Sequence, residues 1–350
     1  MKRPVRTVLF AAFITLFLVG APAVVLYTAG YRYNPRNGHI VRTGVLSVSS
    51  TPRGAHILFD NVDTGRTTPY VFNRITPGAY QVTLTHDDYH TYVDDVIVES
   101  GKSAYVSGVA LFAVGEPLLL NEESGDVTPA VDGNTALVVR NHTAIAEAWR
   151  YSIRNRSYTL LASANDFFSV PTSIVELREG ENAIEVRNVQ SPDTLLSLLP
   201  IADYTIAFAD GPYAVLTTPD DALYVIDIYA GQPIALSTTA TAWSTHNGML
   251  VWTDGVEVNT FSFSSHATTF ITRQSAPIVD VALDTNSTTV FVATATTVQS
   301  LTVDDNGTQV TTLATMNDIE QCWTSGNAQS SLFVLGTVND VRGFYELGLR

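Results

Sequence analysis

Six stretches of this 350-residue chain repeat one pattern at nearly constant spacing. Each consists of an apolar run, a short turn of polar, Gly or Asp residues, and a second run in which apolar and polar residues alternate. Alternation with a period of two is typical of strands that bury one face. The six stretches begin at Ala136, Ile174, Tyr213, Met249, Thr289 and Ser331, and these starting points are 38, 39, 36, 40 and 42 residues apart.

A spacing of about 40 residues is close to the length of one four-stranded propeller blade. We therefore predict a β-propeller-like domain of about six blades over residues 131–350. The alternative is a tandem array of β-sandwiches. A closed ring is favoured because it hides the strand edges that so many strands would otherwise expose. In such a ring the last run, Gly343 to Leu349, would pair with a strand from early in the chain.

The N-terminal part contains 25 residues without a charge, Thr7 to Tyr31. A helix needs roughly 20 apolar residues to cross the hydrocarbon core of a membrane. The preceding residues 1–6, MKRPVR, are basic, which favours a cytoplasmic N-terminus. We predict a single transmembrane helix over residues 7–31, kinked at Pro22, with the bulk of the chain extracytoplasmic.

A cleaved signal peptide is the competing interpretation of this segment. Ala21-Pro22-Ala23 has small residues at the spacing that signal peptidase prefers. The apolar run continues past this point through Leu26, so cleavage would leave an exposed apolar tail, and an uncleaved anchor is favoured. Tyr31-Arg32-Tyr33 is typical of an interfacial belt, and residues 32–43 are expected to form a linker.

Charge is distributed unevenly along the chain. Residues 1–42 carry six basic and no acidic residues, which leaves 13 basic and 34 acidic residues and a net charge of −21 for the rest. Such a surface repels phosphate backbones, so nucleic acid is excluded as an expected partner, and the charge keeps the domains soluble. The single cysteine, Cys322, cannot form an internal disulfide and is expected as a small apolar residue in a strand.

Residues 44–114 show short alternating runs at close spacing. In one run Ala55, Ile57 and Phe59 share a face, and in another Tyr80, Val82 and Leu84 do so. The pattern predicts a small antiparallel β-sandwich. Residues 115–130 contain Pro, Gly and acidic residues and are expected to form a connector. Turns are marked by Pro52-Arg53-Gly54, Asp63-Thr64-Gly65, Pro77-Gly78 and Ser100-Gly101-Lys102.

This sandwich resembles the PEGA domain family. The matching pieces are GVLSVSSTPRGA at 44–55, TGRTTP at 64–69, TPGAYQVTL at 76–84 and VIVESG at 96–101. Arg53 stands where the family name spells Glu, and Asp88-Tyr89 stands where the family often has Gly-Tyr. The resemblance implies an extracytoplasmic β-sandwich used for surface attachment or display, and it implies no catalysis.

One cluster in the sandwich has the residue types of a metal site. The segment HDDYH, His86 to His90, holds two His and two Asp, and alternate residues would share a face in an extended strand. A polar turn with Tyr89 reaching into the core is the favoured interpretation, because Asp-Asp is typical of turns. We predict no metal ligands and no cofactor.

The propeller region lacks the common catalytic motifs. It has no G-x-S-x-G, no HExxH and no Gly-rich phosphate loop. Paired carboxylates could still be assembled from distant loops. Several residues of this region could belong to a catalytic or binding site, but we favour a structural position, in a turn or in the core, for each of them. These are His142, His246 and His266; the turns Asp210-Gly211, Asp254-Gly255 and Asp305-Asn306-Gly307; Trp149, Trp243, Trp252 and Trp323, which could stack on sugars but are expected in the core; and Asn141, Asn155, Asn286 and Asn306, which begin Asn-x-Ser/Thr triplets in expected surface turns.

Two classes of function remain for the whole chain. The first is a membrane-anchored extracytoplasmic binding or display protein. In it the PEGA-like module attaches the protein to the cell envelope or serves as a spacer, and the propeller presents a binding face to a cell-envelope polysaccharide or a surface protein. The second is a surface hydrolase with its active site in the propeller mouth. We favour the first, which is not an enzyme, and we predict no catalytic residues.

Overall fold

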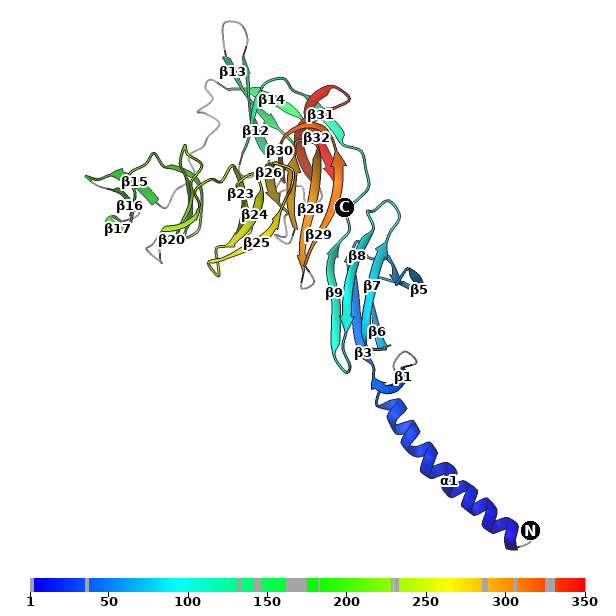
Figure 1. Cartoon of the computed structure of the whole chain (residues 1–350). Coiled ribbons are helices and arrows are strands. Elements are labelled where there is room, and N and C mark those ends of the chain that lie inside the picture. The colour runs from blue at the N-terminus through cyan, green and yellow to red at the C-terminus, as the bar shows by residue number, and fades with distance from the viewer. Residues whose placement is uncertain are drawn as a thin grey trace. The chain divides into compact units, whose positions relative to one another are not determined.

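A computed structural model shows an all-β protein with one N-terminal apolar helix (Figure 1). It has two compact units, residues 1–113 and 114–349. The structure describes residues 3–34, 38–130, 134–141, 146–161, 175–181, 183–189, 191–227, 229, 233–284, 289–304, 307–324 and 331–349.

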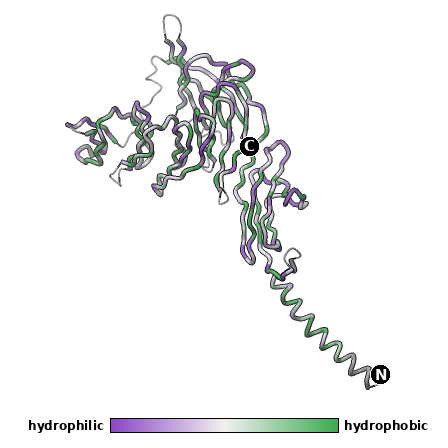
Figure 2. The backbone as a smooth tube through the Cα atoms, in the orientation of Figure 1, coloured by the Kyte–Doolittle hydropathy of each residue, from purple (hydrophilic) through white to green (hydrophobic). Residues whose placement is uncertain are grey.

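Helix α1 spans Arg3–Thr28 and continues through Pro22. Its segment Phe10–Thr28 is long and apolar enough to cross a membrane, although a signal sequence passes the same test. Figure 2 shows that apolar residues run along the helix. Large side chains such as Phe10, Phe13 and Phe17 are about 70% exposed (68%, 71% and 72%). Within the described chain, nothing packs on this part of the helix to bury them.

The end of α1 is tied to the segment that follows it. The expected linker, residues 32–43, contains part of a hairpin formed by β1 (Tyr31–Asn34) and β2 (His39–Arg42). Arg32 Nη1 donates to the carbonyl oxygens of Tyr27 and Tyr31, at 2.9 and 2.8 Å. Thr43 donates to the Gly30 carbonyl oxygen through its backbone N–H and its hydroxyl. The Tyr27 carbonyl lies in the last turn of α1, where a helix leaves carbonyl groups without an intrahelical donor, and the Gly30 and Tyr31 carbonyls belong to the segment that follows the helix.

The following residues form the predicted β-sandwich. One sheet has the order β5-β4-β7-β8 and the other β6-β3-β9, in which β3 and β9 are parallel. The strands are β3 (Gly44–Thr51), β4 (His56–Phe59), β5 (Val62–Thr67), β6 (Tyr70–Ile75), β7 (Gly78–Thr85), β8 (Tyr92–Val98) and β9 (Ser103–Ala110). Alternate residues such as Ile57, Val82 and Leu84 are fully buried in the core between the sheets, as predicted.

Thr68 holds the corner between β3 and β4. Its side-chain oxygen bonds to the Ser50 hydroxyl at 2.6 Å and accepts the Ala55 N–H at 3.1 Å. Its backbone carbonyl accepts the Gly54 N–H, and its N–H donates to the Ala55 carbonyl. The two proline-containing motifs of the PEGA pattern are therefore parts of one hydrogen-bonded corner.

One predicted turn in this unit is wrong. The β4–β5 turn consists of Asp60 and Asn61, both with positive φ, because their polar side chains tolerate the left-handed region. Asp63-Thr64-Gly65 lies instead inside β5, at a register shift opposite Ile57 and Leu58. The Asp63 carboxylate accepts the Gly65 N–H at 2.8 Å, so an Asp-x-Gly turn signal here marks a bulge.

Gly54 tests the importance of this corner. It has φ +96°, and a Cβ at this position would meet only His86 Nε2 at 3.9 Å, so any penalty is conformational. We expect Gly54→Ala to lower the free energy of unfolding of this unit by about 1–3 kcal/mol. The control is Gly78→Ala, where φ is not in the left-handed region and the nearest atom is 3.8 Å away. Equal urea midpoints for the two variants would contradict the role assigned to Gly54.

The second unit consists of six successive antiparallel sheets. Their orders are β11-β12-β13-β14, β15-β16-β17, β18-β19-β20-β21, β22-β23-β24-β25, β26-β27-β28-β29 and β10-β32-β31-β30. The strands are β10 (Leu118–Glu122), β11 (Asp126–Pro129), β12 (Thr135–Asn141), β13 (Ala146–Ser152), β14 (Ser157–Leu160), β15 (Val175–Glu179), β16 (Ile184–Asn188), β17 (Ser191–Leu199), β18 (Thr205–Asp210), β19 (Tyr213–Thr217), β20 (Leu223–Asp227), β21 (Pro233–Ser237), β22 (Ala242–His246), β23 (Met249–Thr253), β24 (Glu257–Ser262), β25 (Ala267–Arg273), β26 (Ile278–Leu283), β27 (Thr289–Thr294), β28 (Thr297–Asp304), β29 (Gly307–Thr315), β30 (Asn317–Thr324), β31 (Ser331–Val338) and β32 (Val341–Gly348).

All six repeats found in the sequence are hairpins in these sheets. They are β12–β13, β15–β16, β19–β20, β23–β24, β27–β28 and β31–β32. By this alignment β15 corresponds to the second strand of the other sheets. The three-stranded sheet thus lacks a described counterpart of the first strand, and the preceding residues 162–174 lie outside the described part of the chain.

Neighbouring sheets share hydrophobic cores. One core joins β15–β17 to β18–β21, a second joins β18–β21 to β22–β25, and a third joins β22–β25 to β26–β29. A fourth core joins the first sheet to the last, with the rings of Tyr151 and Phe344 stacked at 4.5 Å. Strand β26 also contacts β30. Among the described residues, no such core joins β11–β14 to β15–β17.

The predicted pairing of the last strand with early chain is confirmed. Strand β32 pairs antiparallel with β10 in the last sheet, next to β31 (red in Figure 1). The expected connector, residues 115–130, therefore contains two strands, β10 and β11. The Pro, Gly and acidic residues on either side of β10 indicate a connector, but β10 itself begins with three leucines, and Leu118 of this outermost strand is 55% exposed.

Gly343 tests this pairing. A Cβ on Gly343 would lie 2.3 Å from the Asn121 carbonyl oxygen and 2.8 Å from Leu119 Cδ1, both in β10. We expect Gly343→Ala to push β10 away and to lower the free energy of unfolding by about 1–3 kcal/mol. Gly348→Ala, in the same strand with nothing within 4 Å, is the control and should change it by less than about 0.5 kcal/mol. Indistinguishable thermal melts would argue against a tight β10–β32 contact.

Candidate functional site

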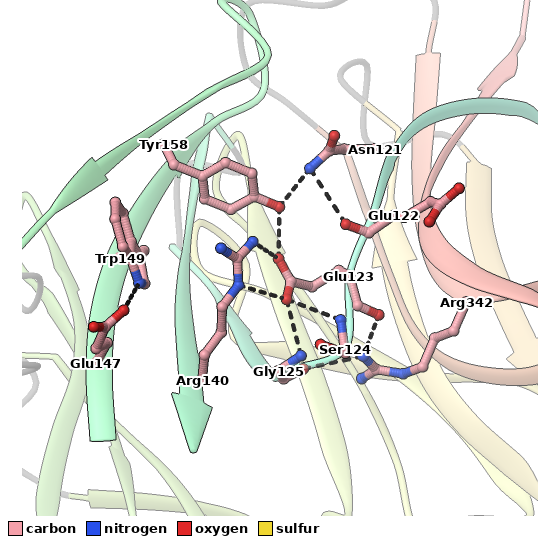
Figure 3. Close-up of polar contacts among 10 residues, drawn as sticks. All are labelled: Asn121, Glu122, Glu123, Ser124, Gly125, Arg140, Glu147, Trp149, Tyr158 and Arg342. Atoms are coloured by element: carbon pink, nitrogen blue, oxygen red, sulfur yellow. Dashed lines mark hydrogen bonds and ion pairs between the residues drawn. The ribbon is translucent and has the colours of Figure 1, made fainter. Parts of the chain in front are cut away.

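Glu123 lies where the chain passes from the last sheet to the first. It directly follows β10 and precedes β11, so only residues 123–125 separate strands of the two sheets. The Glu123 side chain is fully buried. Figure 3 shows its carboxylate surrounded by groups from several strands. We call Glu123, Arg140, Tyr158 and Arg342 the seam cluster.

The Glu123 carboxylate accepts five hydrogen bonds. Oε1 accepts the backbone N–H groups of Ser124 and Gly125, both at 2.9 Å, and Arg140 Nε at 3.1 Å. Oε2 accepts Arg140 Nη2 at 2.8 Å and the Tyr158 hydroxyl at 2.5 Å. Arg140 comes from β12 and Tyr158 from β14, so the carboxylate holds the first sheet by two strands (Figure 3).

The backbone of the same residue binds the last sheet. The Glu123 N–H donates to the Arg342 carbonyl at 3.0 Å, and the Glu123 carbonyl accepts Arg342 Nη1 at 2.8 Å. Arg342 Nη1 also reaches the Gly125 carbonyl, and its other nitrogens pair with Glu320 of β30. One residue therefore joins the first and last sheets, through its side chain on one side and its backbone on the other.

Electrostatics favour the ionised form of Glu123. Burial alone would raise its pKa, but the hydrogen bonds from Arg140, Tyr158 and the Gly125 N–H, with the Arg140 charge, lower it to about 2. Burial and the bond to Glu123 raise the pKa of Tyr158. A carboxylate this acidic, with both oxygens occupied, is a poor general base or metal ligand. The seam cluster is therefore suited to holding sheets together.

The HDDYH segment forms a turn. Asp87 and Asp88 lie in the turn, with Asp88 at φ +64°, and Tyr89 packs against the sandwich core. The rings of His86 and Tyr89 contact edge to face at 4.9 Å. Burial lowers the pKa of His90. Within the described residues no group of three or more His, Cys, Asp or Glu side chains is placed to hold a metal ion. The polar turn with Tyr89 against the core is confirmed.

The four tryptophans lie in or against hydrophobic cores, as expected. Trp252 and Trp323 are buried members, and Trp149 and Trp243 pack against core clusters from partly buried positions. Among the histidines, His266 Nε2 lies 3.1 Å from Asp227 and its ring stacks on Phe261.

The remaining sequence candidates occupy structural positions or fall outside the description. The Asp254 carboxylate accepts the N–H groups of Val256 and Glu257 in the β23–β24 turn. Gly211 has φ +54° between β18 and β19, and Asn155 is an exposed turn residue. His246 lies in β22 and Asn141 ends β12. His142, Asn286 and the turn residues Asp305 and Asn306 lie outside the described residues.

A second carboxylate, that of the partly buried Asp280, links two neighbouring sheets. Asp280 of β26 accepts the Cys322 N–H of β30 and the Val281 N–H, both at 2.8 Å. Burial raises the pKa of Asp280 to about 7, against these two bonds, which lower it. Cys322 is a free, buried strand residue, as predicted. Cys322 binds Asp280 through its backbone N–H.

Residues 43–109 match the PEGA domain. The resemblance found in the sequence is thereby confirmed: the chain carries a PEGA domain, and the β-sandwich of the first unit is that domain. No curated protein matches the chain.

Solved structures similar to this chain are distant ones. Hsv2p of Kluyveromyces lactis has a TM-score of 0.38 and 11% identity, over 63% of this chain and 72% of that chain. The complex of KlAtg21 with the coiled coil of AgAtg16 gives 0.39 and 10%, over 65% and 81%. U3-55K gives 0.37 and 10%, over 77% and 92%. Likeness at this level defines no function, so we take the propeller-like arrangement from the sheet topology itself.

Glu123→Gln tests the seam cluster. An amide would place a donor against the Arg140 guanidinium or the backbone N–H groups, and breaking a buried pair typically costs about 3–5 kcal/mol. The exposed neighbour Glu122→Gln is the control. Differential scanning calorimetry should show a large fall in melting temperature for the first variant only, and equal falls would contradict the role of the cluster.

The low pKa of Glu123 also predicts an acid dependence. Because the pKa is about 2 in the folded chain and 4.5 in its ordinary state, the stabilisation is complete above pH 4.5. It is lost as the pH falls toward 2, and it amounts to about 3 kcal/mol at 1.36 kcal/mol per pKa unit. Urea unfolding between pH 6 and 2 should show this loss in the wild type, and Tyr158→Phe should shift it to higher pH. An unshifted pH profile of stability in Tyr158→Phe would contradict the hydrogen bond from Tyr158 to Glu123.

Proposed function

We propose that this chain is a single-pass membrane protein with a cytoplasmic N-terminus, whose two folded units lie outside the cytoplasm and bind or display a protein or glycan. The observation that carries the proposal is the exposed apolar surface of α1. Side chains that are about 70% exposed along a 19-residue apolar segment need a nonpolar environment, and a bilayer supplies it.

The attachment of α1 to the PEGA domain supports an uncleaved anchor. Arg32 binds the Tyr27 carbonyl in the last turn of the helix, and Thr43 binds the Gly30 carbonyl two residues beyond its end. Cleavage after Ala23 would leave Val24 and Val25, 62% and 63% exposed, as an apolar stub on an acidic domain. Retention of the whole helix avoids exposing that stub to water.

We further propose that the second unit is a closed six-bladed propeller that presents a binding face, and that the PEGA domain spaces it from the membrane or attaches it to the envelope. Support comes from six successive sheets, the cores between neighbours, and the sharing of the last sheet by both ends of the unit. The net charge of −21 beyond residue 42 suits a basic protein surface or a neutral glycan. The carboxylates of Asp280 and Glu123 are engaged in holding sheets together, so neither favours the hydrolase alternative.

Membrane fractionation tests the anchor. We expect the native chain to start at its own N-terminus by intact mass, to sediment with membranes, and to resist extraction by high salt and alkaline carbonate. External protease should degrade the folded units in intact cells and spare an epitope tag placed before Met1.

Ala23→Leu separates the anchor from a signal peptide, because it removes the small residue that signal peptidase requires. For an anchor, the wild type and this variant fractionate identically. A soluble wild-type form beginning at Val24, with the variant held in the membrane, would overturn the anchor.

A further inference from the structure

The junction between α1 and the PEGA domain gathers arginines around a tyrosine. The Arg32 guanidinium carbon lies 3.7 Å from the centroid of the Tyr27 ring, and the Arg74 guanidinium carbon lies 6.0 Å from the same centroid. Arg32 belongs to β1 and Arg74 to β6, so the fold brings together residues that are distant in sequence. Arg42, at the end of β2, has its side chain beside Gly101. We call Arg32, Arg42 and Arg74 the arginine collar.

No carboxylate partner is recorded for the collar in the described part of the chain. The first acidic residue of the sequence is Asp60. Glu99, in the β8–β9 turn, pairs with Lys102. Both guanidinium carbons lie within 6.0 Å of one ring centroid, so their separation does not exceed the Debye length of about 8–10 Å and salt screens their repulsion incompletely. An anion bound between them would relieve that repulsion.

The collar lies at the level where an anchored α1 leaves the membrane. Tyr27 is in the last turn of the helix, and the apolar segment ends at Thr28. Tyr27, Tyr31 and Tyr33 are 57%, 38% and 66% exposed, as residues of an interfacial belt are. In Figure 1, β1 lies directly beside the end of α1. The anions present at this depth are the phosphates of lipid headgroups.

The donors of the collar suit a phosphate group. Arg32 donates to the carbonyl oxygens of Tyr27 and Tyr31 through Nη1. Because the guanidinium group is planar, its other two nitrogens point away from those oxygens. Arg74 and Arg42 are exposed. A guanidinium binds phosphate oxygens in a two-pronged geometry and is more weakly hydrated than an ammonium group. Arginines on the outer side of a membrane run against the positive-inside tendency, and phosphate contacts offset that disadvantage.

We propose that the arginine collar binds the phosphate of an anionic phospholipid headgroup in the outer leaflet and so fixes the PEGA domain against the membrane surface. This inference rests on the proposed function, because it places α1 in the bilayer. The bound lipid contributes its phosphate to Arg32 and Arg74, while Tyr27 and Tyr31 lie beside its glycerol backbone. Arg42 adds a third positive charge at the rim.

The test measures lipid binding by the purified full chain in a neutral detergent. Fluorescently labelled phosphatidylglycerol and phosphatidylcholine are titrated separately, with anisotropy as the readout. The wild type should prefer phosphatidylglycerol, and Arg74→Gln should weaken that binding about five-fold, the change expected for one basic residue at an anionic lipid surface. Arg42→Gln/Arg74→Gln should weaken it further while leaving the Arg32 cap intact.

Arg66→Gln is the matched control. Arg66 is an exposed arginine of the same domain whose guanidinium lies 5.0 Å from the Tyr70 ring, and it should bind phosphatidylglycerol like the wild type. Equal binding of the two lipids, or equal loss in Arg66→Gln and Arg74→Gln, would overturn the collar. Full displacement by inorganic phosphate alone would overturn the assignment to a lipid. Membrane fractionation of the same variants reports on the anchor separately, because a neutral glutamine at position 74 leaves α1 unchanged.

Discussion

The second unit depends on one buried carboxylate. Glu123 follows the outermost strand of the last sheet and precedes the first strand of the first sheet. Its carboxylate binds Arg140 and Tyr158 of the first sheet, and its backbone binds Arg342 of the last sheet. The last sheet contains strands from both ends of the unit, so the two ends of the chain are held together there. Pairing of β10 with β32 supplies backbone bonds there, and Glu123 adds a charged contact that is strong because water is excluded.

A different constraint governs the first unit. A short hairpin, β1–β2, lies between the apolar helix, which ends at Thr28, and the PEGA domain, which matches from residue 43. Arg32 of this hairpin binds the Tyr27 carbonyl of α1 and stacks on the Tyr27 ring. At the corner between β3 and β4 in the same domain, Thr68 forms hydrogen bonds with Gly54 and Ala55.

Much of this fold could be predicted because the signals are local. Strand alternation located the six hairpins, and the turn chemistry of the sandwich was correct at Pro77-Gly78 and at Ser100-Gly101. The errors have a common cause. Asp63-Thr64-Gly65 has the composition of a turn but lies in a bulge, and β10 lies among Pro, Gly and acidic residues typical of a connector but forms a strand because it pairs with β32. In both cases the partner strand, which is distant in sequence, decided the structure.

The sequence by itself determined an apolar helix, a PEGA domain and a repeating β pattern, since each depends on residues within about 40 positions of one another. Only the tertiary structure decided the seam cluster and the arginine collar. Glu123 meets Arg342 across 219 positions, and nothing local distinguishes this glutamate from the exposed Glu122 beside it. Its burial and its low pKa arise when β10, β12, β14 and β32 converge, because hydrogen bonds and desolvation depend on neighbours in space.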